Sequence, residues 1–410
     1  MHCPNGTYDA TGVHGAPLRP GASAKAAPCA GHGPGAARML FFSGGSALKE
    51  TARELKHRAP LCVHLVTPFD SGGSSAVLRK AFAMPAVGDM RSRLLALSDE
   101  NRPGVREVFT LLSYRLQTNT PQKQNRAELV RLTNGSHPLM CQIPEPQNAV
   151  LRDHLRWFAA HMPEDFALEG ACLGNLFLAA GYLRANNTLG PVITLLSRLV
   201  HARGIVRPVV EQSAQLAVRL ENGQSIIGQA RFTGKAGAPV NSPIREIWLT
   251  QDEHGLNPLP PEAVVITPRI AKLVARAQSI CYPIGSFYSS LIANLLPGGV
   301  AGAIAECAGP KILVPNPGKD PELLGHTLED QIDTLLDTLG KNAPGAAAGR
   351  FLSHVLVDTQ SGHYAGGIPH RRLEALGISL VDRPFIYRDK PHIAHPRLLA
   401  EALLDISGRK

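Results

Sequence analysis

The stretch MLFFSGGSALKE, residues 39–50, decides how the rest of the chain is interpreted. Its apolar start predicts a buried strand over Arg38–Phe42, and the residues beyond the turn predict a helix over Ser46–His57. Gly44 and Gly45 lie between the two, and glycines in that place let a backbone approach a phosphate closely. Both common phosphate-loop patterns, GxxxxGK(S/T) and GxGxxG, are absent. The stretch therefore predicts a strand–turn–helix unit that looks like a phosphate-binding loop without its usual lysine, and the pattern alone leaves open what the turn holds.

The residues that follow alternate between strand and helix patterns, which predicts an α/β fold. We expect residues 38–410 to form a Rossmann-like three-layer sandwich with a mostly parallel sheet. A polar, proline-containing segment, 118–168, predicts a helical insertion or cap with one helix near Ala149–His161. Residues 1–37, rich in Gly, Ala and Pro, predict a disordered tail. Asn222-Gly223 predicts a β-hairpin between 216–221 and 224–230. Further strands are expected at 61–67, 244–250, 279–282, 311–314, 354–358 and 378–381.

Composition limits the classes of function. The formal charge of +9, from 42 basic and 33 acidic side chains, suits an anionic ligand. Only 5% of residues are aromatic and no basic run alternates with aromatics, so a platform for single-stranded nucleic acid is not expected. Seven cysteines without a CxxC pair argue against a disulfide scaffold or a zinc site and indicate a cytoplasmic protein. No apolar run approaches the roughly 18 residues that span a membrane.

A second turn, DSGGSSAVLRK at 70–80, places Asp70 at the end of a predicted strand. Main-chain N–H groups in such a turn form a concave anion site, to which hydroxyls add donors. A carboxylate at the strand end could hold Mg²⁺ through oxygen. A flexible surface turn explains this segment equally well when it is taken alone. The residues that would bind the anion are Gly72, Gly73, Ser74 and Ser75.

A third segment, GDMRSRLL at 88–95, opens a predicted helix with Asp89 and Arg91 in its first turn. Asp89 suits a helix start, where it caps N–H groups. Arg91 gains nothing from that end of the helix dipole, so either a nearby anion or simple exposure accounts for it.

A fourth segment, CYPIGSFYSSLIANLL at 281–296, again runs from a strand through glycine and serine into a helix. Ligands of open α/β sheets lie at the carboxyl ends of the strands, where all these turns are expected to meet. The residues of this segment expected to bind phosphate or nucleotide are Gly285, Ser286, Tyr288 and Asn294.

These segments occur in an order that resembles one protein family. The chain reads SGGSAL, VTPFDSGGSSAVLR, MPAVGDMRSRLLALSD, GACLGNLFLAAG, IGSFYSSLIANLL and GHTLEDQI between residues 43 and 332. The order is similar to that of the family joining 2-phospho-L-lactate transferase (CofD) with the YvcK-type gluconeogenesis factors. The spacing resembles the YvcK-type branch more closely.

The resemblance implies two functions. CofD moves a phospholactyl group from a nucleotide diphosphate donor to a deazaflavin alcohol with magnesium, which implies a Mg²⁺-dependent transferase of a phosphoryl-linked group. YvcK-type proteins look like nucleotide-sugar binders that regulate rather than catalyse, which implies a regulator with a protein partner. A homodimer is compatible with both.

The resemblance also implies roles for individual residues. Asp70 and Asp89 would be the catalytic and metal-binding carboxylates. The paired aspartates of the family read Asp70-Ser71 here, so Asp89 would take the place of the second one. The loss of that aspartate favours the regulator, whereas the added segment 118–168 favours the enzyme. The residues implied to bind phosphate or nucleotide are Gly44, Gly45, Ser46, Gly72, Gly73, Ser74, Ser75, Arg91, Asn175, Gly285, Ser286, Tyr288 and Asn294.

Overall fold

The computed structural model describes residues 39–408, apart from 45, 60, 235–236 and 252–256. The predicted tail, 1–37, lies outside the described residues. Within the described part, no helix is both long and apolar enough to cross a membrane.

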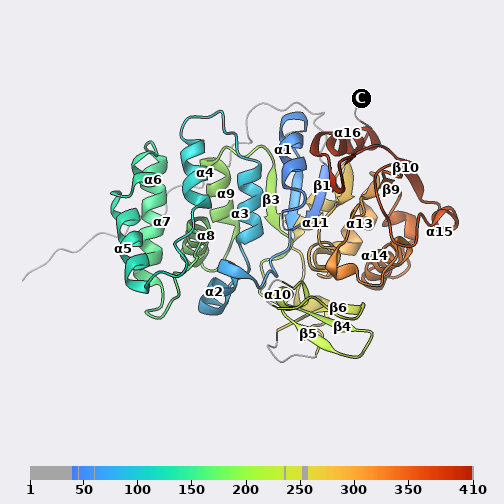
Figure 1. The fold of residues 1–410 in the computed structure, drawn as a ribbon, viewed down its shortest axis with the longest axis horizontal. Helices are drawn as coiled ribbons and strands as arrows, with labels where there is room; N and C mark the ends of the chain where they lie inside the picture. Colours follow the sequence, from blue (N-terminus) through green and yellow to red (C-terminus); the bar gives the residue numbers. More distant parts are fainter. Residues whose placement is uncertain (1–38, 45, 60, 235–236, 252–256, 409–410) are drawn as a thin grey trace, which may run out of the picture. The chain divides into compact units, whose positions relative to one another are not determined.

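The centre of the fold is a seven-stranded sheet in which every pair of neighbours is parallel. Its order is β10-β9-β8-β7-β1-β2-β3, so the first strand lies inside the sheet, between β7 and β2 (Figure 1). The predicted α/β fold with a mostly parallel sheet is therefore confirmed. The strands are β1 Met39–Ser43, β2 Val63–Val66, β3 Ile205–Pro208, β7 Ser279–Tyr282, β8 Lys311–Leu313, β9 His354–Val357 and β10 Ser379–Asp382.

The side chains of β1 alternate between two helical layers because successive residues of a strand point to opposite faces. Met39 and Phe41 pack with residues of α1 and α16, whereas Leu40 and Phe42 belong to the cluster that includes α11, α13 and α14. Every residue of β1 is buried, as expected for a central parallel strand. The helices of the two layers are α1 Lys49–Arg58, α11 Pro268–Ala275, α12 Ala293–Leu295, α13 Val300–Glu306, α14 Leu328–Asn342, α15 His370–Ala375 and α16 Pro396–Ile406. A π-helix at Phe287–Ile292 precedes α12.

A second helical cluster surrounds α8, whose residues from Leu173 to Tyr182 are all buried. Segment 118–168 contributes three helices to it, where the sequence predicts one. Helices α5 and α7 pack on each other and α7 packs on α8 (Figure 1). Phe158 of α7 is buried against Phe82 and Phe166, so it belongs to the core. The helices are α2 Gly73–Phe82, α3 Gly88–Ala96, α4 Val105–Ser113, α5 Gln122–Asn134, α6 Pro138–Cys141, α7 Gln147–His161, α8 Leu173–Arg184 and α9 Gly190–Leu199.

A small antiparallel sheet, ordered β5-β4-β6, follows β3 in the chain. The predicted hairpin is present, but its second strand is shorter than expected, because residues 229–230 begin helix α10. A further two-stranded sheet, β11-β12, lies near the carboxyl terminus and has no predicted counterpart. The elements are β4 Gln215–Leu220, β5 Ser225–Ile227, α10 Gln229–Phe232, β6 Ile244–Thr250, β11 Ile386–Tyr387 and β12 Lys390–Ala394.

Candidate functional site

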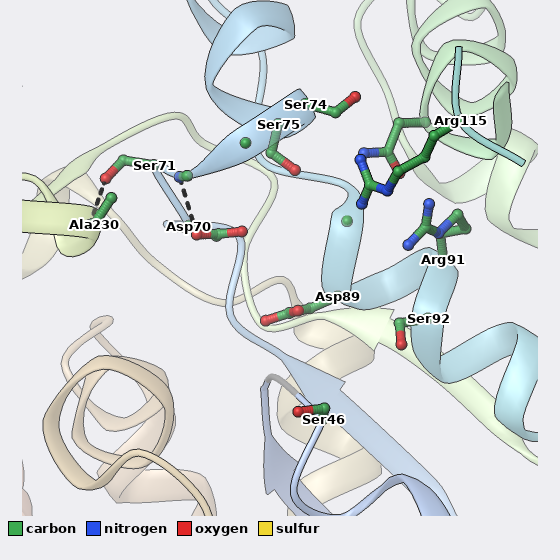
Figure 2. Close-up of a pocket in the computed structure, with 14 residues that line it drawn as sticks. Ser46, Asp70, Ser71, Ser74, Ser75, Asp89, Arg91, Ser92, Arg115 and Ala230 are labelled. Atoms are coloured by element: carbon green, nitrogen blue, oxygen red, sulfur yellow. Dashed lines mark hydrogen bonds between the residues drawn. The ribbon is translucent and has the colours of Figure 1, made fainter. Parts of the chain in front are cut away.

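A pocket of about 430 Å³ lies where β1 and β2 end and α2 and α3 begin (Figure 2). This volume falls within the range of small-molecule sites. It also lies at the carboxyl edge of a parallel sheet, where ligands of such folds bind. The lining residues are Ser46, Asp70, Ser71, Gly72, Gly73, Ser74, Ser75, Gly88, Asp89, Arg91, Ser92, Arg115, Asn175 and Ala230.

The turn between β2 and α2 is fixed by its own hydrogen bonds and by a buried arginine. The carboxylate of Asp70 accepts a hydrogen bond from Gly72 N–H at 3.1 Å. Arg79, in the last turn of α2, donates to the carbonyl oxygens of Phe69 and Asp70 at 2.9 and 3.0 Å and to that of Ala214 at 2.6 Å. Because Arg79 is buried behind the turn, it shapes the site without lining the pocket.

The start of α3 lies directly against the start of α2. A Cβ atom on Gly88 would approach Ser75 Oγ to 2.8 Å, so a larger residue there would force the Ser75 side chain to move. Among the described residues, no acceptor pairs with the N–H groups of Gly73, Ser74, Ser75 or Gly88. Two helix N-termini thus turn unpaired donors and the positive ends of their dipoles toward one pocket, which is the usual arrangement for binding anions.

Two arginines line the same pocket, Arg91 on α3 and Arg115 just after α4. Burial lowers the pKa of Arg91, contact with the Cys172 thiol opposes this, and the neighbouring Arg115 lowers the pKa further. Figure 2 shows the two arginines on one side of the pocket and Asp70 and Asp89 on the other. Among the described residues, no ion pair joins either guanidinium to a carboxylate.

Asn175, on α8, is the one pocket residue contributed by that helix. Its side chain is 2% exposed, and its Oδ1 has no hydrogen-bond partner within the described part of the chain. A buried, unpaired amide oxygen is costly, and a hydrogen-bond donor on a ligand would satisfy it.

The start of the π-helix after β7 differs from the starts of α2 and α3 because the protein itself fills it. The N–H of Phe287 donates to Asp320 at 2.9 Å, and those of Tyr288 and Ser289 donate to Glu322 at 2.9 and 2.8 Å. Burial, followed by repulsion from Asp320, raises the pKa of Glu322 to about 7. Burial also raises the pKa of Asp320. The donors that a phosphate would need here are already used by two carboxylates.

The remaining predicted residues of this region serve the fold in the same way. Gly285 donates its N–H to Asn316 at 2.8 Å. The Tyr288 hydroxyl donates to the carbonyl of Ile244 at 3.1 Å, and burial raises the pKa of Tyr288 to about 12. Asn294 donates to the carbonyl of Ser43 at 3.1 Å, which ties this segment to the end of β1.

The structure therefore divides the predicted site residues into two groups. One group lines the pocket: Ser46, Asp70, Gly72, Gly73, Ser74, Ser75, Asp89, Arg91 and Asn175. The other group does not: Gly44, Gly285, Ser286, Tyr288 and Asn294. Gly45 lies outside the described residues. At Gly44, a Cβ atom would lie 2.9 Å from Ser290 Oγ, so this glycine is needed for the contact between two turns.

Sequence reasoning missed Arg115 and the carboxylates Asp320 and Glu322. Arg115 follows a helix in a segment without a turn motif, so nothing in its neighbourhood marks it. Asp320 and Glu322 flank Pro321 in a segment without a site motif, and their contact with the turn after β7 spans more than thirty positions of the chain.

The pocket fits a magnesium ion only when a ligand completes the coordination. Asp70 and Asp89 line it together with serine hydroxyls. Among the described residues, no group of three or more His, Cys, Asp or Glu side chains could hold a metal ion by itself. Mg²⁺ is commonly bound through one or two carboxylates plus phosphate oxygens of the substrate, and this donor set agrees with that pattern.

Comparison of the sequence with known proteins identifies the family of this chain. Residues 39–375 match the family described as 2-phospho-L-lactate transferase CofD. The chain belongs to the CofD family. It is 25% identical to the gluconeogenesis factor of Halalkalibacterium halodurans, over 90% of this chain and 95% of that protein. It is 26% identical to the gluconeogenesis factor of Bacillus subtilis, over 74% of this chain and 75% of that protein.

A solved structure shares the fold. The crystal structure of a UPF0052-family protein from Bacillus halodurans superimposes with a TM-score of 0.65 at 22% identity and covers 91% of this chain and 100% of that one. The resemblance inferred from the six sequence segments is confirmed by these family and relative matches.

Proposed function

We propose that the protein is a transferase that binds a nucleotide diphosphate donor with Mg²⁺ and transfers its phosphoryl-linked group to an alcohol. The observation that carries this proposal is the composition of one pocket. Carboxylates, unpaired helix-start donors and guanidinium groups meet there, and a diphosphate with a bound cation is complementary to all three. The family match supports the same reaction class.

In this proposal, Asp70 and Asp89 hold the Mg²⁺ ion, which would neutralise charge on the diphosphate when bound. The N–H groups of Gly73, Ser74 and Gly88 donate to phosphate oxygens, and Arg91 neutralises the charge of the leaving group. Most of the acceleration would come from positioning and from fixed electrostatic stabilisation.

The atoms of the proposed step balance without an oxidant or a reductant. The alcohol oxygen forms a bond to the phosphorus of the transferred group, and the P–O bond between the two phosphoryl groups breaks. The nucleoside monophosphate leaves with the bridging oxygen, and the alcohol proton passes to a carboxylate oxygen of Asp70 or Asp89.

A second function is supported by Ser71, which stands where the family has a second aspartate. Its hydroxyl accepts a hydrogen bond from Ala230 N–H at 2.9 Å, so the position connects the turn to α10 instead of adding a carboxylate to the pocket. With the relatives named gluconeogenesis factor, this favours a regulator that binds a nucleotide sugar and acts through a protein partner.

Thermal unfolding of the full chain with and without Mg²⁺ tests the proposal against a panel of nucleoside diphosphates, nucleotide sugars and inorganic pyrophosphate. A ligand at about 100 times its Kd adds roughly 2.7 kcal/mol of apparent stability. We expect a Mg²⁺-dependent stabilisation by a diphosphate that Asp70→Asn reduces strongly. Asp337→Asn is the matched control, because Asp337 is exposed on α14 and does not line the pocket.

The two functions differ in what happens to the bound molecule. A transferase supplied with alcohol acceptors releases nucleoside monophosphate, which ³¹P NMR detects. A nucleotide sugar that binds equally well without Mg²⁺ and stays intact would support the regulator. An absence of stabilisation by every diphosphate in the panel would contradict both functions.

A further inference from the structure

Two guanidinium groups face one pocket from separate elements. Arg91 belongs to the first turn of α3, and Arg115 follows α4. Burial lowers the pKa of Arg91, and the positive charge of Arg115 lowers it further. Like charges gathered in a concave, partly buried site are stabilised when an anion lies between them.

Arg91 is held in place by its surroundings. Its Nη1 hydrogen bonds to the Cys172 thiol. Its side chain crosses α8 where a Cβ atom on Gly174 would come within 2.6 Å of Arg91 Cδ, so only glycine leaves room for it. Its Nε is buried without a partner among the described residues. A fixed arginine loses little side-chain entropy on binding a ligand.

Arg115 is tied to the same place through the main chain. Leu116 N–H donates to Ala171 at 2.9 Å, and Leu173 N–H donates to Tyr114 at 3.0 Å, so residues 114–116 pair with 171–173. Cys172, at the centre of this pairing, is the residue whose thiol contacts Arg91. A continuous set of contacts therefore sets the positions of both arginines.

The Arg115 guanidinium keeps most of its donors for another molecule. Its Nη1 donates to the carbonyl of Gly170 at 3.0 Å, and no other hydrogen bond of this side chain is present within the described residues. Arginine has five N–H donors in a planar fork that matches phosphate and carboxylate groups.

We propose that Arg91 and Arg115 form a clamp for a second anionic group of the ligand, separate from the phosphate held at the starts of α2 and α3. The inference rests on the proposed function, because it assigns the ligand of that same pocket two oxyanion groups. The second group is a phosphate, as in a diphosphate, or the carboxylate of a phosphorylated acid. Arg115 is thereby a specificity-determining residue for ligands with two anionic groups.

Isothermal titration of the full chain in Mg²⁺ buffer tests the clamp with three probes: inorganic phosphate, inorganic pyrophosphate and phosphoglycolate. We expect Arg115→Ala to weaken a two-anion probe by about tenfold to a hundredfold, the range for charge-assisted hydrogen bonds. Inorganic phosphate should change by less than about threefold, since one phosphate is satisfied by the helix starts. The probe that shows the larger loss, pyrophosphate or phosphoglycolate, identifies the second group.

Two further variants separate binding from structure. Arg115→Gln retains a donor for the Gly170 carbonyl but loses the charge, so it should bind a two-anion probe as weakly as Arg115→Ala, while Arg115→Lys should recover part of the affinity. Arg276→Ala is the control, because Arg276 is exposed and lies outside the pocket. Unliganded melting temperatures show whether any variant has lost stability.

The outcomes distinguish the clamp from the function on which it rests. If the wild type binds pyrophosphate or phosphoglycolate and the alanine and glutamine variants bind it within about threefold, the clamp is wrong and the phosphate pocket stands. Equal losses for phosphate and for the two-anion probes would also contradict the clamp, because Arg115 would then bind the first phosphate. No binding of any probe by the wild type would overturn both.

Discussion

The turn between β2 and α2 and the turn after β7 both run from a parallel strand through glycine and serine into a helix. In the first, which we call the open turn (residues 70–75), helix-start N–H groups have no acceptor among the described residues and line a pocket. In the second, the closed turn (residues 285–289), the corresponding N–H groups donate to Asp320 and Glu322. Two similar local sequences therefore differ in whether the protein supplies an acceptor for their helix-start N–H groups.

The difference shows that a glycine-serine turn gives the geometry of an anion site but not its occupant. At the closed turn, carboxylates from residues 320–322 take the place that a phosphate would take. Internal carboxylates make that turn part of the folded core, and Glu322 is 1% exposed. Ligand binding is therefore expected at the open turn, and stability effects are expected at the closed one.

The largest expected effect is the loss of Glu322. In Glu322→Ala, the N–H groups of Tyr288 and Ser289 and the Ser289 hydroxyl, which donates to Glu322 at 2.5 Å, lose their acceptor in a buried place. Unpaired buried donors cost about 1–3 kcal/mol each, so we expect the free energy of unfolding to fall by about 3–5 kcal/mol in urea denaturation.

Glu374→Ala is the matched control for this measurement, because Glu374 is exposed on α15. A loss in Glu322→Ala no larger than that of the control would show that the closed turn does not depend on its carboxylates. A variant that binds inorganic phosphate more tightly than the wild type would show that the vacated donors accept an anion.

The next effect is a dependence of stability on pH. The pKa of Glu322 is raised from 4.5 to about 7 in the folded protein. Between these values the folded state binds more protons at this position than the unfolded state, so the free energy of unfolding falls as the pH rises from about 4.5 to about 7. The contribution of this group is about 3 kcal/mol over that range.

Glu322→Gln removes this titration while it keeps an acceptor for the helix start. We expect the difference in unfolding free energy between wild type and variant to change by about 3 kcal/mol between pH 4.5 and pH 7, in the direction that favours the variant at higher pH. Parallel curves for the two proteins across this range would mean that Glu322 does not titrate there.

The sequence predicted the open turn better than the closed one for a physical reason. Asp70, Gly72–Ser75 and the start of α3 are close in the chain, so strand ends and helix starts alone bring them together. Local patterns also gave the bounds of β6 and β7 as the structure has them. What they could not give is contact across the chain, such as that between Glu322 and the turn after β7.

The elements that were missed have weak local signals. β3 is an edge strand of four residues that includes Arg207 and ends at Pro208, a composition that reads as a loop. Helix α5 is polar, and Asn125 and Thr133 are among its buried residues, so its buried face lacks a clear apolar stripe. In both cases the neighbours in space, rather than the residues of the element, determine the structure.

The smallest expected effect concerns Ser71, which joins the open turn to helix α10. In Ser71→Ala, the Ala230 N–H loses its acceptor, and because the site is partly exposed, water can replace the hydroxyl. We expect a loss of about 1 kcal/mol in the free energy of unfolding. Since Ala230 lines the pocket, the affinity for pyrophosphate with Mg²⁺ should also fall, by a few-fold.

Ser71→Asp separates the two roles of this position. A carboxylate still accepts a hydrogen bond from Ala230 N–H, so the free energy of unfolding should be retained. The added charge places a further carboxylate beside Asp70 and Asp89. Tighter Mg²⁺-dependent binding in Ser71→Asp than in the wild type would show that the open turn is a metal–phosphate site lacking one carboxylate. Weaker binding in that variant, with unchanged stability, would mean that the anion itself lies next to Ser71 and that the metal lies elsewhere in the pocket.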